Sequence, residues 1–89
     1  MKKIKLINCV VINHIKGSVE AVPFTNTSEA ADFCQFVMNM ERNILEVFFN
    51  RKCDVEFDHE NQKMTLMNTT DDMTIVEINI SVHELEFQE

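Results

Sequence analysis

The sequence predicts a small α+β domain, in which one antiparallel β-sheet carries a single long amphipathic helix on one face, with the chain order β-β-α-β-β-β. Two kinds of periodicity support this prediction: a helical apolar repeat across residues 28–51, and alternating apolar and polar residues on both sides of it. A length of 89 residues, 45% of them apolar, suits one hydrophobic core. We therefore expect residues 1–89 to form a single domain.

The N-terminal part has the pattern of a β-hairpin. Residues 3–15 carry apolar side chains in both phases of an extended chain, which is typical of an interior strand covered on two sides. Gly17 follows, and residues 18–22 are expected to return as a short second strand. Pro23 has no N–H to donate, so it should end that strand or lie on a sheet edge.

A cluster of capping residues precedes the helical repeat. Asn26, Thr27 and Ser28 are all candidates for the N-cap, because their short side chains can accept the free N–H groups of the first turn. The helix is expected to end at Arg51, where a cation suits the negative end of the helix dipole.

The apolar surface of this helix is wider than the arc of about 100° that one sheet requires. The surplus has to be covered by a loop, by the chain termini or by another chain. The stripe expected to lie on the sheet comprises Phe33, Phe36, Val37, Met40, Ile44, Val47 and Phe48, and Cys34, Met38, Leu45 and Phe49 extend it around one flank. Covering by a second copy predicts a homodimer interface formed by Met38, Leu45 and Phe49.

The C-terminal part is expected to be entirely β. Residues 53–58 alternate strictly between apolar and acidic, residues 63–67 form the returning strand, and residues 76–82 alternate again. The apolar phase reverses at Leu85, which predicts a β-bulge near Glu84 or a change of strand partner there.

Charge divides the chain into two unequal parts. Residues 1–52 hold five acids and seven bases, a net charge of +2, whereas residues 53–89 hold ten acids and Lys63 as their one base, a net charge of −9. The total is −7. An asymmetry of this size within one small domain indicates an acidic surface.

The usual signatures of catalysis and metal binding are missing from the sequence. No two short-spaced Cys or His pairs suggest zinc, and one glycine cannot form a phosphate-binding loop. The cysteines fall in apolar phases, where an inert buried thiol is the default, and the histidines have an ordinary interpretation as solvent-facing residues. We therefore expect no enzymatic activity, no metal and no cofactor; the residues concerned are Cys9, Cys34, Cys53, His14, His59 and His83.

The same composition leads to predictions about the cellular location of the protein and about direct binding to nucleic acid. Three widely spaced cysteines argue against a disulfide framework, and no stretch reaches the roughly 20 apolar residues of a membrane span. These features predict a cytoplasmic protein that does not associate with a membrane. The chain has no basic stripe and neither Tyr nor Trp, so we do not expect it to bind nucleic acid directly.

The acidity of residues 53–89, the acidic half of the chain, is the main indication of function in the sequence. The simplest interpretation is a solvated face that maintains solubility. The more specific interpretation is a surface that binds a basic protein. In one form of it, the carboxylates mimic nucleic-acid phosphates and occupy a nucleic-acid-binding groove. Phage-encoded inhibitors of host nucleases and anti-CRISPR proteins share this small size, acidity and lack of catalytic groups. The predicted partner-binding residues are Asp54, Glu56 and Asp58 on one outward row, Glu77 on a neighbouring row, and Glu60, Asp71 and Asp72 in the turns.

Two alternatives belong to other classes of protein. One is a homodimeric structural or assembly protein with no target related to nucleic acid, favoured by the wide apolar arc of the helix. The other is a small-ligand-binding domain with a pocket between helix and sheet, near Cys34 or Cys53.

Overall fold

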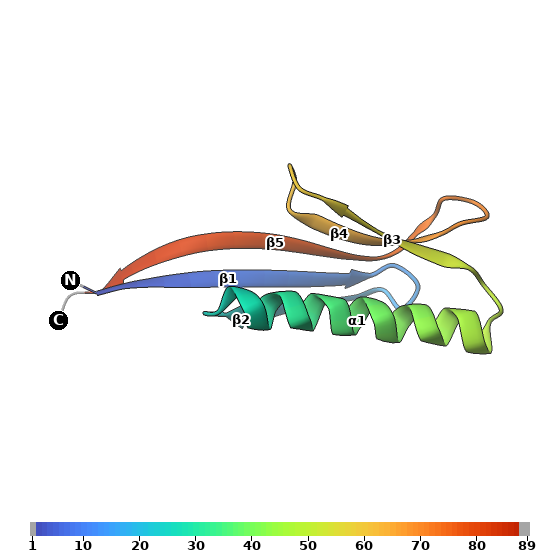
Figure 1. Ribbon diagram of the computed structural model, residues 1–89, viewed down its shortest axis with the longest axis horizontal. Helices are drawn as coiled ribbons and strands as arrows, with labels where there is room; N and C mark the ends of the chain where they lie inside the picture. Colours follow the sequence, from blue (N-terminus) through green and yellow to red (C-terminus); the bar gives the residue numbers. More distant parts are fainter. Residues whose placement is uncertain (1, 88–89) are drawn as a thin grey trace.

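The computed structural model describes residues 2–87 and shows the predicted α+β fold, with one helix packed on one face of a five-stranded antiparallel sheet (Figure 1). The order along the chain is β-β-α-β-β-β, as predicted. The elements are β1 (Lys2–Asn13), β2 (Ser18–Phe24), α1 (Thr27–Phe48), β3 (Cys53–Asp58), β4 (Lys63–Asn68) and β5 (Thr74–Phe87).

The strands lie in the order β2-β1-β5-β4-β3, so the first and last strands of the chain are neighbours in the middle of the sheet. The pairing of β1 with β5 runs from Lys2 opposite Phe87 to Asn13 opposite Val76. β1 is interior, as its two apolar phases predicted, but α1 covers only one of its faces. Pro23 lies on β2, which is an edge strand, where its missing N–H costs no ladder hydrogen bond.

Asn13 and Gly17 form the turn between β1 and β2. The buried Asn13 amide oxygen accepts hydrogen bonds from the backbone N–H groups of Ile15 and Lys16, both at 3.0 Å. Gly17 has a φ of +69°, and its N–H donates to the Asn13 carbonyl at 2.8 Å. A residue without a Cβ adopts this left-handed conformation at little cost, which is why the single glycine of the chain stands here.

α1 begins as expected and ends earlier. Asn26 is the N-cap, and its side chain accepts from the N–H groups of Ser28 and Glu29 at 2.8 and 3.2 Å. The helix stops at Phe48 instead of residue 51, because Asn50 takes a left-handed φ of 51° and the Arg51 N–H then donates back to the Leu45 carbonyl at 3.0 Å.

The helix rests on the sheet through a face other than the predicted one. Ala30, Cys34, Met38 and Leu45, spaced by four, four and seven residues, are the buried positions of α1. The predicted sheet-facing stripe is wrong at four of its members, which stand exposed on the opposite side: Phe36 (64% exposed), Met40 (42%), Val47 (74%) and Phe48 (77%). The core of sheet and helix comprises Ile7, Cys9, Ala30, Cys34, Met38, Leu45, Cys53, Leu66, Ile75, Val76 and Ile78.

This orientation also corrects the predicted dimer interface. Met38 is 1% exposed and Leu45 is 6% exposed, so both side chains belong to the intramolecular core and are not available to a second copy. Phe49 remains 63% exposed beyond the last turn of α1. The apolar surface that α1 exposes to solvent is therefore formed mainly by residues outside the predicted interface, namely Phe36, Met40, Val47 and Phe48.

β5 continues without a bulge at Glu84. Its register with β1 passes evenly through Lys5 opposite Glu84 and Ile4 opposite Leu85, and the irregularity of the sheet lies between Leu66 and Met67. The apolar phase reverses where β1 and β5 extend beyond the end of α1 as a two-stranded ribbon (Figure 1). In this ribbon, Ile4 and Leu85 lie opposite each other, on the face that α1 leaves uncovered in the rest of the sheet.

Candidate functional site

Three of the predicted partner-binding carboxylates line the outer strand of the sheet. Within β3, Cys53 and Val55 face α1, so the alternate residues Asp54, Glu56 and Asp58 point to the opposite face. All three are exposed, and successive side chains on the row are about 7 Å apart along an extended strand. The predicted acidic row is therefore present, and it lies at one edge of the sheet.

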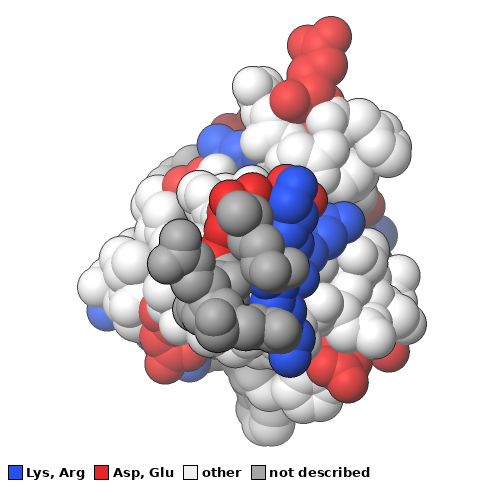
Figure 2. Space-filling model, turned by 90° about the vertical axis from the view of Figure 1, so that its left-hand side faces the viewer, with Lys and Arg blue, Asp and Glu red and all other residues white. Residues whose placement is uncertain are grey.

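The row continues into the turn between β3 and β4. The Asp58 carboxylate accepts from the N–H groups of Glu60 and Asn61 at 3.0 and 3.3 Å, and from the Asn61 amide at 2.7 Å. These hydrogen bonds, led by the one from the Asn61 amide, hold the pKa of Asp58 below its usual value. Glu60 is exposed in the same turn. The β3–β4 turn is the highest part of the molecule in Figure 1, and acidic side chains project from the top of the molecule in Figure 2.

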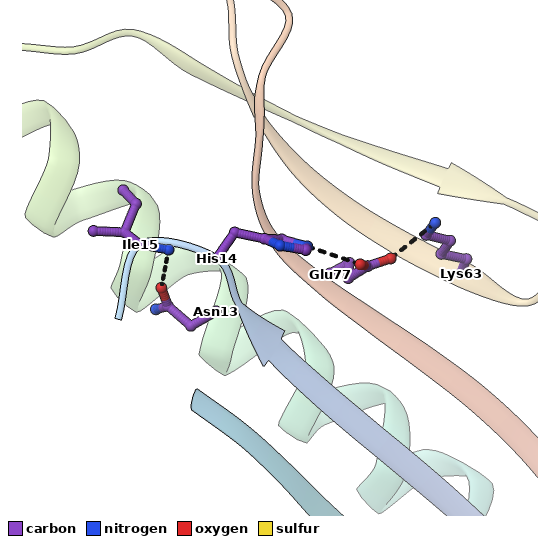
Figure 3. A network of polar contacts seen from close by, with 5 residues as sticks. All are labelled: Asn13, His14, Ile15, Lys63 and Glu77. Carbon is purple, nitrogen blue, oxygen red and sulfur yellow. Dashed lines mark hydrogen bonds and ion pairs between the residues drawn. The ribbon is translucent and has the colours of Figure 1, made fainter. Parts of the chain in front are cut away.

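Glu77 shares the face of this row but is already paired. Thr65 lies opposite both Glu56 and Glu77 in the register, which places the two glutamates on the same face with one strand between them. The Glu77 carboxylate accepts from Lys63 Nζ at 2.8 Å and contacts His14 Nε2 at 2.8 Å (Figure 3). The hydrogen bonds from Lys63 and His14 lower the pKa of Glu77.

Asp71 and Asp72 lie in the loop between β4 and β5, beside the beginning of β3. The loop is attached there by Thr69, whose N–H and hydroxyl both donate to the Lys52 carbonyl at 3.0 Å. Asp71 lines a shallow polar hollow together with Arg51 and Lys52. The Asp71 carboxylate therefore stands near two cations.

The acids of the last strand are also matched by bases. Glu84 and Glu86 lie opposite Lys5 and Lys3 in the register, and Lys3 Nζ is 3.6 Å from the Glu86 carboxylate. Figure 2 shows basic side chains gathered beside the chain ends. Within residues 2–87, the exposed carboxylates that form one continuous group free of ion pairs are Asp54, Glu56, Asp58 and Glu60, which we call the acidic edge.

The cysteine thiols sit in environments that suppress their reactivity. Cys9 and Cys34 are buried between β1 and α1 with their sulfur atoms 3.8 Å apart. Burial raises the pKa of all three thiols, and that of Cys34 to about 12, with the neighbouring Cys9 adding to the effect. Because the thiolate is the nucleophile, such thiols react slowly at neutral pH.

The histidines are separated from one another and from the thiols. His14 pairs with Glu77, His59 packs edge-on against Phe57, and His83 Nε2 lies 3.2 Å from the Ser81 hydroxyl. Over residues 2–87, no three His, Cys, Asp or Glu side chains are grouped so as to hold a metal ion.

An open groove does lie between helix and sheet near Cys34, where the ligand-binding alternative expected a pocket. It measures about 420 Å³ and is lined mainly by apolar side chains, including Ile7, Phe57 and Ile80. Lys5 is the only lining residue with a charged side chain. The groove therefore suits apolar contact and lacks the converging polar groups that fix the orientation of a small ligand.

Sequence reasoning missed the cations that pair with Glu77 and Glu86, two acids of residues 53–89. Their partners come from distant parts of the chain: Lys3 and His14 from β1 and its turn, and Lys63 from β4. The strand order that brings β1 beside β5 is the missing information.

No helix among the described residues is long and apolar enough to cross a membrane. No protein-family model, curated protein or solved structure matches the chain.

Proposed function

We propose that this chain is a non-enzymatic interaction protein whose acidic edge binds a basic protein. The observation that supports the proposal is the contrast between the four carboxylates of the acidic edge, which are exposed and free of ion pairs, and Glu77 and Glu86, which are paired with cations of the chain itself. A surface that kept its acids for solubility alone would not need four unpaired ones in one continuous group along a sheet edge.

The spacing of the acidic edge indicates the kind of basic partner. Carboxylates about 7 Å apart have about half the linear charge density of one DNA strand, which carries one phosphate per 3.4 Å of helix axis. Four of them imitate a short segment of one strand, not a duplex. The partner that fits is a protein with a small basic groove, such as the phosphate-contacting part of a nucleic-acid-binding protein. Long-range attraction would speed the encounter and weaken as salt rises.

A competing explanation is protection of the sheet edge. β3 has one unpaired side, and charged residues on an edge strand discourage pairing with other chains. The two explanations differ in what a charge reversal does: it removes a binding partner in the first case, and it leaves the list of bound proteins unchanged in the second.

The test is a pull-down with the tagged chain from nuclease-treated host lysate, washed at low and then at high salt. The variant Asp54→Lys with Glu56→Lys reverses the middle of the acidic edge and leaves Asp58, which holds the turn, unchanged. The control, Glu20→Lys with Glu29→Lys, makes the same change in net charge at exposed sites on β2 and α1.

We expect the wild type and the control to retain a basic nucleic-acid-binding protein that high salt releases, and the acidic-edge variant to lose it. Equal recovery by the acidic-edge variant, or recovery of nothing beyond the tagged chain, would contradict the proposal and leave edge protection as the role of these acids.

A further inference from the structure

A pocket of about 370 Å³ lies between the end of β1 and the last turns of α1. Its volume is within the range of about 300–1,000 Å³ that is typical of small-molecule sites. Two of its apolar side chains, Ile15 and Phe49, are each 63% exposed, so apolar surface is open to water here. The apolar lining residues are Ile15, Ile44, Leu45, Phe49 and Ile75, and the polar or charged ones are Asn13, Lys16, Glu41 and Arg51.

Asn13 supplies unused hydrogen-bond donors to this pocket. It is the last residue of β1, in the same phase as the core residues Ile7 and Cys9, and it is 6% exposed. Its amide oxygen accepts from the N–H groups of Ile15 and Lys16, which identifies the other end of the amide as nitrogen (Figure 3). Nδ2 itself donates to no acceptor among residues 2–87.

This free amide nitrogen opens into the pocket. Within residues 2–87, every side-chain nitrogen or oxygen atom that is fully buried in a non-exposed residue has a hydrogen-bond partner. Since Asn13 Nδ2 has none, it must keep access to open space, and the pocket is the open space that Asn13 lines.

Arg51 brings an unpaired positive charge to the same pocket. The left-handed conformation of Asn50 turns the chain back along α1, so that the Arg51 N–H donates to the Leu45 carbonyl at 3.0 Å. The Arg51 guanidinium makes no ion pair with a carboxylate of residues 2–87, although Asp71 lines a neighbouring hollow with it.

The other two charges of the lining are paired with each other. Lys16 Nζ lies 3.9 Å from the Glu41 carboxylate. With this pair set aside, the free polar groups of the pocket are the Arg51 guanidinium and the Asn13 amide N–H groups, and all of them are hydrogen-bond donors. A ligand that fits needs an anionic acceptor group at one end and an apolar body for the rest.

We propose that this pocket binds a small organic monocarboxylate with an apolar body. The carboxylate accepts from the Arg51 guanidinium, whose forked donors match two carboxylate oxygens, and from Asn13 Nδ2. Arg51 is exposed, so its long side chain is free to turn toward the bound group. The body covers apolar surface of Ile44, Leu45 and Phe49.

The same groups disfavour ligands of other charge. A cation would meet the Arg51 guanidinium and would find only the Glu41 carboxylate, which Lys16 already pairs. A dianion such as a phosphate monoester would bring a second negative charge toward Glu41. The pocket lies on the α1 side of the sheet and the acidic edge on the opposite face, so either proposal can fail alone.

The probe for the first test is 4-phenylbutyrate. With about 12 non-hydrogen atoms it matches the pocket, which has the volume of about 12 waters at about 30 Å³ each. We expect a dissociation constant on the order of 0.1–1 mM for a ligand of this size. Amide chemical shifts of the isotope-labelled full chain measure it, and the side-chain amide signals of Asn13 should move on binding.

Two comparison ligands share the body of the probe and differ in charge: the neutral 4-phenylbutanamide and the cationic 4-phenylbutylamine. We expect the carboxylate to bind at least about tenfold more tightly than either, because its hydrogen bonds to Arg51 are charge-assisted. No shifts with the carboxylate up to about 10 mM, well above the expected constant, would overturn the proposal. Equal affinity of carboxylate and amide, or Asn13 side-chain signals that stay in place, would overturn it too.

The second test changes two neighbouring cations. Arg51→Gln removes the free charge of the pocket, and Lys52→Gln makes the same charge change at the next residue, which does not line it. Both residues are exposed and make no ion pair within residues 2–87, so both variants should keep the fold, as circular dichroism would check.

We expect Arg51→Gln to raise the dissociation constant of 4-phenylbutyrate at least about fivefold, and Lys52→Gln to change it less than about twofold. An equal effect of the two variants would overturn the proposal, because it would show that Arg51 makes no specific contact with the carboxylate in the pocket.

Discussion

Glu56 and Glu77 show how one residue type acquires two roles on one face of the sheet. Both lie opposite Thr65 in the register, on the face away from α1. Glu56 is exposed and unpaired, whereas the Glu77 side chain is 14% exposed and held between Lys63 and His14. Glu77 joins β4, β5 and the β1–β2 turn on the uncovered side of the sheet (Figure 3). Glu77 therefore contributes to the fold, whereas Glu56 has no ion pair with the described residues.

The lowered pKa of Glu77 predicts a dependence of stability on pH. A carboxyl group whose pKa is depressed in the folded state stabilises the fold above its ordinary value of 4.5, and this contribution disappears as the pH falls through the folded-state pKa. Glu77→Gln should therefore lower the free energy of unfolding by about 1 kcal/mol at pH 7. The difference from the wild type should vanish toward pH 3.

Urea unfolding at several pH values measures this difference. Glu56→Gln is the matched control, and it should change stability little at any pH because Glu56 has no ion-pair partner among the described residues. A destabilisation by Glu77→Gln that stays constant from pH 7 to pH 3 would show that the effect comes from packing and not from the charge.

At the scale of elements, α1 shows what periodicity leaves open. The apolar arc is wide enough to contain two stripes, and hydrophobicity alone favoured the one with more phenylalanine. The sheet instead receives Ala30, Cys34, Met38 and Leu45, of which the first two are small enough to let the helix approach the strands closely. Phe36, Val47 and Phe48 are left on the outside.

Two methionines of α1 test this orientation directly. Met38 is fully buried and Met40 is 42% exposed, although they are two residues apart in one helix. Met38→Ala should lower the free energy of unfolding by about 2–5 kcal/mol, through lost burial and the cavity that remains. Met40→Ala should lower it by less than about 1 kcal/mol. Chemical unfolding at low micromolar concentration gives both values, and the reverse ranking would contradict the observed face of the helix.

At the scale of the molecule, the chain is elongated, and its shape follows from one pairing. Its principal extents are 54 × 23 × 23 Å, and its radius of gyration is 15.1 Å. A globular chain of this length is expected to have about 12 Å. β1 and β5 are much longer than β3 and β4, and the ribbon they form projects beyond α1 (Figure 1). The part of the ribbon that carries Lys3 and Glu86 therefore has no helix on either face.

Hydrogen exchange should reveal this difference along a single pair of strands. Amides around Ile4 and Leu85 should exchange at least about tenfold faster than those around Cys9 and Ile80. Only the second group belongs to the part of the sheet that packs in the hydrophobic core with α1. Amide exchange followed by NMR measures this difference residue by residue. Equal protection along both strands would show that the ribbon is stabilised by something other than α1.

The sequence by itself determined the elements, their order and the alternation that points Asp54, Glu56 and Asp58 to one face. These features depend on local periodicity, capping and turn chemistry, which act between residues close in the chain. It also predicted the N-cap region, and of the two places it allowed for Pro23, a strand end or a sheet edge, the structure shows the edge. The end of α1 differed, because Asn50 adopts a left-handed conformation that its neighbours in sequence did not reveal.

Only the tertiary structure decided which acids are free, which face of α1 is buried and where apolar surface remains open. Glu77 and Glu86 are neutralised because the strand order places β5 beside β1 and β4, whose cations are far away in the sequence. Met38 is buried and Val47 exposed because the sheet covers only one of the two apolar stripes of α1. Pairings of this kind are set by long-range contacts, and periodicity within one element carries no information about them.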